Sequence, residues 1–363
     1  MTGRTGKWLR AACASAAVAL VAAGCSSGGG STALPQSGAP EKTTLNVGVV
    51  PAMDSAGFFV ALDEGLFTRE GLTVKYTPEG SSETAIGAQL QGGLDISGGN
   101  YVSYIEAVAQ HDDPLEIVGE GSIMTPGSQV IYTPKGSGIT SVTDLKGQTV
   151  AVNAPENIDF LLDESVLSGY GITVNKGSGT SPTEVNFPSQ PIEFPDMTTY
   201  LADAAHHISA ATLPEPFASI AQQQGYVPLV DLDQGATQQF PIEGYVVTKQ
   251  WAAKNPNDLK RFLAALEQGQ EIADTDRAAV EKAFEDIKST VKGEPAAAFG
   301  NVPAEIASVM TLNTYPIGID KTRIQRVANV MQQFGLLPSH FDVSSMIMPQ
   351  SEFNFAPYGG SNS

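Results

Sequence analysis

The chain has 363 residues, is 42% hydrophobic and carries a formal net charge of −19. This length allows about two domains, each with a core of its own. So acidic a surface repels nucleic acid and anionic lipid, which argues against a nucleic-acid-binding function. Both cysteines, Cys13 and Cys25, precede the main body of the chain. The rest therefore has no thiol for a disulfide, a metal site or a nucleophile.

The first 25 residues have the pattern of an export signal. Three basic residues come first, Arg4, Lys7 and Arg10, before an apolar stretch at 11–23 that is too short to span a bilayer. The run Leu20–Cys25 resembles a bacterial lipobox. That resemblance implies removal of residues 1–24 and acylation of Cys25, which places the protein outside the cytoplasm, on the outer face of the cell membrane or in the periplasm. An ordinary signal peptide with an incidental cysteine is the alternative.

Residues 25–42 are rich in Ser, Gly and Pro and predict a flexible tether. From Thr44 onward, strand and helix patterns alternate. The predicted elements are strands at 45–50, 73–77, 94–97, 115–119 and 129–133, and helices at 55–64, 82–91 and from 100 onward. Asp54 or Ser55 is the expected N-cap of the first helix. Strands separated by helices of about ten residues predict a parallel sheet with helices on both faces.

A second unit is expected from about Pro134. Its predicted elements are a strand at 149–152, a helix at 157–167, a short strand at 185–187 and a helix at 197–205, with a long loop over 175–195. The chain then returns to the first unit with a strand at 244–248 and helices at 255–272, 276–291 and 320–334. We therefore expect one lobe from 43–130 and 242–345, a second lobe from 131–241 and a tail at 346–363.

Five segments occur in the order of a known family. They are Gly57–Phe67 with Glu70–Val74, Leu90–Ile96, Asp144–Val152, Glu215–Ala221 and Phe341–Ser344. Over about 44–345 the chain resembles the SsuA-like and thiamine-precursor-type substrate-binding proteins of ABC importers. The resemblance implies an α/β, bilobed periplasmic-binding-protein type II fold, with two parallel or mixed sheets flanked by helices. It also implies a hinge of two crossing strands, expected near 130–134 and 242–247. The chain departs from the family at 206–210, where His-His-Ile-Ser-Ala replaces Gly-x-Val-Asp-Ala.

Ligands of open parallel sheets bind beyond the carboxyl ends of the strands, where helix N-termini converge. The resemblance implies that five such loops face a cleft between the lobes. The candidate ligand-binding residues on these loops are Asp54, Ser55, Ser82, Asn100, Tyr101, Glu156, Asn157 and Glu215. Gly98 and Gly99 allow a ligand to approach the backbone closely. The alternative is that these are the caps and turns of any α/β protein.

The charge on and beside these loops favours one class of ligand. The acidic residues are Asp54, Glu83, Glu156, Asp159 and Glu215, with no Lys or Arg among them. A buried carboxylate facing an anion costs several kcal/mol unless it is protonated or paired, whereas a helix N-terminus stabilises the anion by only roughly 0.3–1 kcal/mol. The pattern predicts a neutral or cationic nitrogenous ligand, such as a pyrimidine thiamine precursor, over nitrate, a sulfonate or taurine. That the acids are caps facing solvent is the alternative.

The function predicted is a solute-binding lipoprotein that delivers a small molecule to an ABC permease with its ATPase subunits. A monomer without cofactor, metal or catalytic residues is expected. No cysteine-rich motif of the related thiamine-pyrimidine synthases, P-loop or HExxH motif occurs. The adjacent His206 and His207 would point about 100° apart on a helix and do not readily chelate one ion. A synthase-like enzyme and a protein-binding surface lipoprotein are the remaining alternatives.

Overall fold

The computed structural model describes residues 38–177, 179–287 and 302–349. The chain divides into two units, Met1–Gln36 and Ser37–Ser363, and every described residue belongs to the second. The export signal, Cys25, most of the tether and residues 350–363 lie outside the described residues. The processing, lipidation and tether assigned to them therefore stay predictions.

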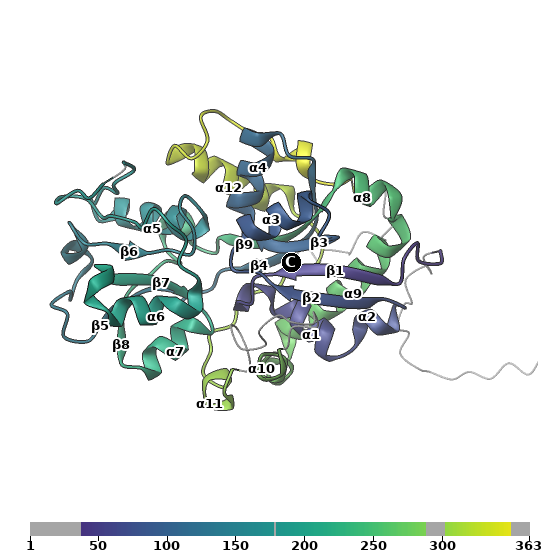
Figure 1. Cartoon of the computed structure of the whole chain (residues 1–363), viewed down its shortest axis with the longest axis horizontal. Coiled ribbons are helices and arrows are strands. Elements are labelled where there is room, and N and C mark those ends of the chain that lie inside the picture. The colour runs from purple at the N-terminus through teal and green to yellow at the C-terminus, as the bar shows by residue number, and fades with distance from the viewer. Residues whose placement is uncertain (1–37, 178, 288–301, 350–363) are drawn as a thin grey trace, which may run out of the picture. The chain divides into compact units, whose positions relative to one another are not determined.

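The first of two sheets has five strands in the order β2-β1-β3-β9-β4 (Figure 1). Its strands are β1 (Thr44–Val49), β2 (Thr73–Pro78), β3 (Ile96–Asn100), β4 (Leu115–Ile123) and β9 (Pro241–Thr248). β1 pairs in parallel with β2 and β3, but β9 runs antiparallel to both β3 and β4. The sheet is therefore mixed rather than purely parallel, because the strand that returns from the second unit enters in the opposite direction.

Helices cover both faces of this sheet, as its apolar strands require. One face carries α1 (Ala56–Asp63), α2 (Leu66–Arg69), α9 (Pro256–Thr275) and α10 (Arg277–Asp286), and the other carries α3 (Ser82–Leu90), α4 (Tyr101–His111) and α12 (Lys321–Gln333) (Figure 1). α8 (Lys249–Lys254) follows β9, and α11 (Ala304–Ala307) precedes α12. Phe67 stacks on Phe262 with ring centroids 5.1 Å apart, which joins α2 to α9.

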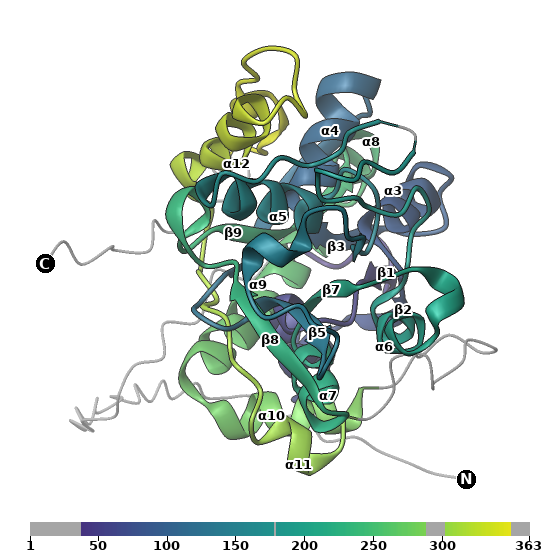
Figure 2. The ribbon, with the colours of Figure 1, turned by 90° about the vertical axis from the view of Figure 1, so that its left-hand side faces the viewer.

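The second sheet has four strands in the order β6-β7-β5-β8 (Figure 1), and Figure 2 shows β5, β7 and β8 from another side. They are β5 (Gln129–Pro134), β6 (Val150–Ala151), β7 (Ala210–Pro214) and β8 (Tyr226–Asp231), of which β7 and β8 are absent from the sequence prediction. α5 (Ile158–Gly169) covers one face, while α6 (Phe194–Ala202) and α7 (Phe217–Gln223) cover the other. We call residues 129–231 the second part and the remaining described residues the first part.

The apolar core consists of three clusters. One lies around α1 and α9 in the first part, and another lies between the second sheet and α6 with α7. The third contains residues of α4 and α12 together with residues of α5, so it draws on both parts. The two sheets are distinct, but the parts pack against each other in this conformation.

The chain passes between the sheets twice, at residues 124–128 and 232–240. The two passages lie side by side, because Met124 N–H donates to the Phe240 carbonyl over 2.8 Å. The positions expected from the sequence, 130–134 and 242–247, are wrong by several residues, since both segments lie inside sheets. A third segment braces the passages: Thr314 forms a bridge with Ile123, and Thr125 Oγ1 donates to the Leu312 carbonyl over 2.6 Å.

Candidate functional site

A buried acidic side chain follows the carboxyl end of β1. Asp54 lies in the short 3₁₀ helix Met53–Ser55 and is 9% exposed. Its Oδ1 accepts hydrogen bonds from Ser122 Oγ over 3.2 Å and from Asn313 Nδ2 over 2.7 Å. Burial raises the pKa of Asp54 to about 6, against the lowering effect of these two hydrogen bonds. Near neutral pH this carboxyl can therefore gain or lose its proton.

A second carboxyl, that of Glu243 on β9, lies beside Asp54. Ser55 Oγ donates to Glu243 Oε1 over 2.6 Å and also lies 3.2 Å from the Val50 carbonyl. Burial, followed by repulsion from Asp54, raises the pKa of Glu243 well above its usual value. Ser55 was expected to cap α1, but its hydroxyl makes these contacts and no capping hydrogen bond. The sequence signal for Glu243 was present: an acidic residue inside the apolar strand Pro241–Thr248.

The N-termini of α3 and α4 meet at the end of β3. Asn100 donates from both its backbone N–H (2.9 Å) and its Nδ2 (2.8 Å) to Ser82 Oγ, while its Oδ1 caps α4 by accepting from Ser103 N–H. A Cβ on Gly99 would lie 2.5 Å from Ser82 Oγ, so this contact requires glycine. Asn100 thus caps α4, and Ser82, the first residue of α3, cross-links the two helix N-termini by accepting from Asn100. Whether they also contact a ligand stays a prediction.

Tyr101 is fully buried in the core cluster that α4 shares with α12. Its ring lies over Gly244, where a Cβ would come within 2.5 Å of the tyrosine Cε1. The hydroxyl has no hydrogen-bond partner among the described residues. Close by, Arg323 of α12 forms a two-pronged ion pair with the buried Glu120, with nitrogen–oxygen distances of 3.1 and 3.2 Å. In this conformation Tyr101 is a packing residue of the first part.

The N-terminus of α5 supplies three more polar residues. Asn157 caps α5 through Oδ1, which accepts from Phe160 N–H over 3.3 Å. Glu156 is exposed in the left-handed region at φ 57°, and no hydrogen bond of its side chain is described. Asp159 is fully buried and accepts from Asn153 N–H over 3.0 Å and from the Gln129 side-chain amide. Burial, and then repulsion from Asp54 and Glu83, raises its pKa to about 7.

Glu215 joins the second part to the first. Its Oε2 accepts from Ser219 N–H over 3.0 Å, and its Oε1 accepts from Ser219 Oγ (2.9 Å) and Thr311 N–H (3.1 Å). Its carbonyl accepts from Met53 N–H over 2.8 Å. Burial raises the pKa of this carboxyl above its usual value. Thr311 and Met53 belong to the first part, so one residue makes contacts across the boundary through both backbone and side chain.

A further contact across the boundary lies at the end of β2, the edge strand opposite β4. Asn153 Nδ2 donates to the Gly80 carbonyl over 2.9 Å. Together with the contacts of Glu215, it brings the carboxyl ends of β1 and β2 against the second part. Of the residues predicted from the sequence, Asp54 and Glu215 thus lie at the boundary, Ser82 and Asn100 form one hydrogen-bonded group, and Glu156 stays apart. Glu243, Asn313 and Ser122 were missed.

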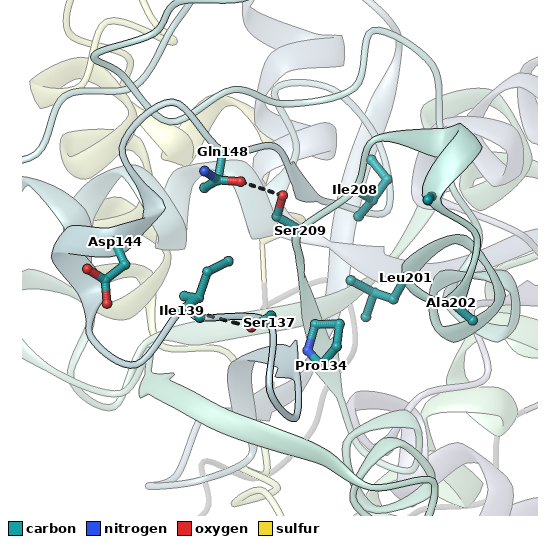
Figure 3. Close-up of a pocket in the computed structure, with 11 residues that line it drawn as sticks. Pro134, Ser137, Ile139, Asp144, Gln148, Leu201, Ala202, Ile208 and Ser209 are labelled. Atoms are coloured by element: carbon teal, nitrogen blue, oxygen red, sulfur yellow. Dashed lines mark hydrogen bonds between the residues drawn. The ribbon is translucent and has the colours of Figure 1, made fainter.

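A cavity of about 450 Å³ lies within the second part (Figure 3). Its wall includes Ile139, Leu201 and Ile208, and Ser209 Oγ donates to Gln148 Oε1 over 2.7 Å at its edge (Figure 3). None of the ligand-binding residues predicted from the sequence lines it. The fold offers this cavity in addition to the acidic side chains at the boundary.

The histidine pair is exposed at the end of a 3₁₀ helix. His206 stacks on Tyr200, with ring centroids 4.0 Å apart, and lies 3.6 Å from the Asp203 carboxylate. In the described part of the chain, no three or more His, Cys, Asp or Glu side chains are grouped as a metal site would require. Within that part, no helix combines the length and the apolar character that a membrane crossing needs.

Two mixed sheets flanked by helices and joined by paired passages define the periplasmic-binding-protein fold. The alkanesulfonate-binding protein SsuA from Xanthomonas axonopodis pv. citri, bound to MOPS, has this fold with a TM-score of 0.64 and 16% identity over 85% of this chain and 99% of SsuA. The periplasmic nitrate-binding protein NrtA from Synechocystis PCC 6803 matches with a TM-score of 0.66 and 15% identity over 88% of this chain and 93% of NrtA. At such identities the likeness concerns the fold alone.

The chain belongs to the NMT1/THI5-like family, whose profile matches residues 52–277. No curated protein matches it in sequence. The fold is also found in an enzyme, the desulfurization enzyme DSZB, with a TM-score of 0.58 and 15% identity over 86% of this chain and 98% of DSZB. Family and fold are therefore established, and the choice between binding and catalysis rests on the chemistry of the site.

Proposed function

We propose that the protein is an extracytoplasmic solute-binding lipoprotein that captures a small molecule between its two parts and delivers it to the permease of an ABC importer. One observation carries this proposal: each part contributes buried carboxyl groups near the contacts that join the two parts, such as the hydrogen bond from Met53 N–H to the Glu215 carbonyl. Asp54 and Glu243 come from the first part, and Asp159 and Glu215 from the second. Family membership and the fold support the same function.

Capture requires that the two parts separate and close. We assign the lobes as 43–130 with 242–345, and 131–241. The hydrogen bonds from Met53 to Glu215 and from Asn153 to Gly80 join these lobes, which is consistent with a closed form. Opening would break both bonds while the paired passages at 124–128 and 232–240 keep the lobes connected.

We propose a nitrogenous ligand, such as a pyrimidine thiamine precursor. Supporting this choice, no described Lys or Arg forms an ion pair with Asp54, Asp159 or Glu243. Where Asp54 and Asp159 are ionised, an anion there would face carboxylates without a counter-charge, at a cost of several kcal/mol, on the order of what a buried unpaired charge loses. The fold of SsuA and NrtA makes a sulfonate or nitrate the second candidate.

Calorimetry on the purified protein tests the proposal with pyrimidines, flavins, taurine and alkanesulfonates. We expect a pyrimidine to bind and a decrease in the radius of gyration, measured by small-angle scattering, to accompany binding. Tight binding of a sulfonate would refute the assignment of a nitrogenous ligand, but the proposed receptor function would still stand. Turnover of a bound compound would instead support an enzyme, as DSZB illustrates for this fold.

A further inference from the structure

The acidic residues at the boundary differ in their ionic partners from Glu120, a buried glutamate within the first part. Glu120 is as inaccessible as they are, and Arg323 neutralises it through two hydrogen bonds. Neither Asp54 nor Asp159 forms an ion pair with any described basic residue. Buried charges are ordinarily paired, because desolvation otherwise costs several kcal/mol. Asp54 and Asp159, one on each part, therefore have only neutral hydrogen-bond donors among the described residues, as does the fully buried Asp163 further along α5, which accepts from Thr212 Oγ1.

A third side chain in the same group has an unused hydrogen-bond acceptor. Asn313 is 7% exposed, and its Nδ2 donates to Asp54 Oδ1, which places its amide against that carboxyl. Its Oδ1 is buried and has no hydrogen-bond partner among the described residues. A buried amide oxygen without a donor is uncommon in a folded protein. Among the described residues several buried polar atoms lack a partner, but this one belongs to a side chain bonded to Asp54, so an N–H donor of a ligand at Asp54 would satisfy it.

The charged groups around the two aspartates are also acidic. Asp159 accepts from the N–H of Asn153, whose side chain bonds the Gly80 carbonyl of the first part. Asp54 follows Met53, whose N–H bonds the Glu215 carbonyl of the second part, so both aspartates lie beside contacts that cross the boundary. Asp54 raises the pKa of Glu243 and of Asp159, and Glu83 also raises that of Asp159. The repulsion between Asp54 and Asp159 acts across the boundary between the parts. A positive charge placed between them would remove this repulsion and favour the conformation in which the parts approach each other.

We propose that Asp54 and Asp159 form the two halves of a binding site for a small organic cation with N–H donors, completed by the Asn313 amide oxygen. A protonated amine, an amidinium or a protonated aminopyrimidine has this chemistry. The inference rests on the proposed receptor function and deepens it, because it names the charge and the donor groups of the ligand. Each part supplies one carboxylate, so only the closed form offers the complete site.

The experiment uses the full chain, purified from membranes in detergent, and probes matched in shape. Benzamidine is the probe that stays cationic over the whole pH range of the experiment, 4-amino-2-methylpyrimidine becomes a cation by ring protonation on the acidic side of neutrality, benzamide is the neutral counterpart of benzamidine, and propanesulfonate is the anion. We expect calorimetry to detect binding of the cations only. Asp54→Asn and Asp159→Asn should each weaken that binding about tenfold or more, as loss of a desolvated charge partner does. Both variants retain a side-chain oxygen acceptor, which favours normal folding.

Asp112→Asn is the matched control, because Asp112 is exposed at the far end of α4 and has a left-handed backbone conformation that asparagine tolerates. It should leave cation binding unchanged. Raising the pH from about 5.5 to about 7.5 should tighten benzamidine binding on the order of tenfold in the wild type, because both carboxyls must lose their protons to pair with it. This pH effect should shrink in either asparagine variant.

Three outcomes overturn the proposal: benzamide or propanesulfonate binds while neither cation does, cation binding is unaffected by Asp54→Asn, or no probe binds. The first two leave the receptor function standing, provided that a ligand still closes the parts in small-angle scattering. If no probe and no compound from the calorimetric panel binds, the receptor function fails with it. Circular dichroism and thermal unfolding of each variant exclude misfolding as the cause of lost binding.

Discussion

Glu215→Ala should destabilise the protein more than its single side chain suggests. Glu215 is 2% exposed and accepts three hydrogen bonds, two from Ser219 and one from Thr311 N–H. Alanine leaves all three donors without this acceptor. Ser219 N–H is buried in the first turn of α7, whereas Thr311 is only half-buried and water can reach it in part.

The expected loss follows from these three donors. A buried donor without a partner costs about 1–3 kcal/mol, so Ser219 N–H should contribute about 2 kcal/mol and Thr311 N–H about 1 kcal/mol. The Ser219 hydroxyl can turn to another acceptor and adds little. Removing a buried carboxyl returns part of this loss. We therefore expect the free energy of unfolding to fall by about 2–3 kcal/mol, which for a chain of this size lowers Tm by roughly 3–5 °C.

Urea unfolding followed by circular dichroism measures this change, with Glu215→Gln as the matched control. Glutamine keeps one oxygen for Thr311 and Ser219 Oγ and loses only the acceptor of Ser219 N–H, for a cost of about 1 kcal/mol. Because the pKa of Glu215 is raised in the folded protein, the wild type gains stability from this group as pH falls. The free energy of unfolding of the glutamine variant should therefore lie furthest below that of the wild type at acidic pH. An alanine variant that loses under about 1 kcal/mol, or a glutamine variant as unstable as alanine, would refute the reasoning.

Three further predictions concern other parts of the chain. Arg323→Met leaves Glu120 buried without its counter-charge and should lower the free energy of unfolding by about 2–3 kcal/mol near pH 8. The loss should be smaller towards pH 5, because the glutamate then becomes protonated. Adding Glu120→Gln should restore most of the stability measured by urea unfolding. Gly99→Ala places a methyl group 2.5 Å from Ser82 Oγ and should lower the free energy of unfolding by about 1–3 kcal/mol, whereas an unchanged Tm would contradict the tight approach. Cys25→Ser should move the protein from the membrane fraction to the soluble extracytoplasmic fraction, as immunoblotting of cell fractions would reveal, because the acyl chains would be lost.

Local patterns predicted the elements of the first part well. The apolar alternation of β1 and the helical spacing of α4 come from neighbouring residues, and Asn100 was placed correctly at the N-terminus of α4. The direction of β9 could not be derived in this way. It depends on where the chain returns from the second part, which is a long-range property. β7 and β8 were missed because their sequences, Ala-Ala-Thr-Leu-Pro and Tyr-Val-Pro-Leu-Val-Asp, contain alanine and proline, which are depleted in strands.

The site was predicted only in part, because local patterns reveal residues at strand ends but not residues that the fold brings together from distant positions. Turn residues such as Asp54 and Glu215 follow strand ends and can be found from strand–turn–helix patterns. Asn313 cannot, since it lies about 260 residues from Asp54 and reaches it only through the fold. Ser55, one of the two residues predicted as the N-cap of the first helix, is the N-cap residue of α1, but its hydroxyl makes no capping hydrogen bond and donates to Glu243 instead.

The segment that braces the passages between the sheets limits how the two parts can move. Thr314 is paired with Ile123 directly before the first passage, and Leu312 holds the Thr125 side chain. A connection of two segments alone could both bend and twist, but a third segment bonded beside them should resist torsion. We therefore expect the parts to move relative to each other mainly by bending. A solute would then meet the same pair of surfaces at every closure, so that selectivity is set by the geometry of the joint as well as by the residues that touch the solute.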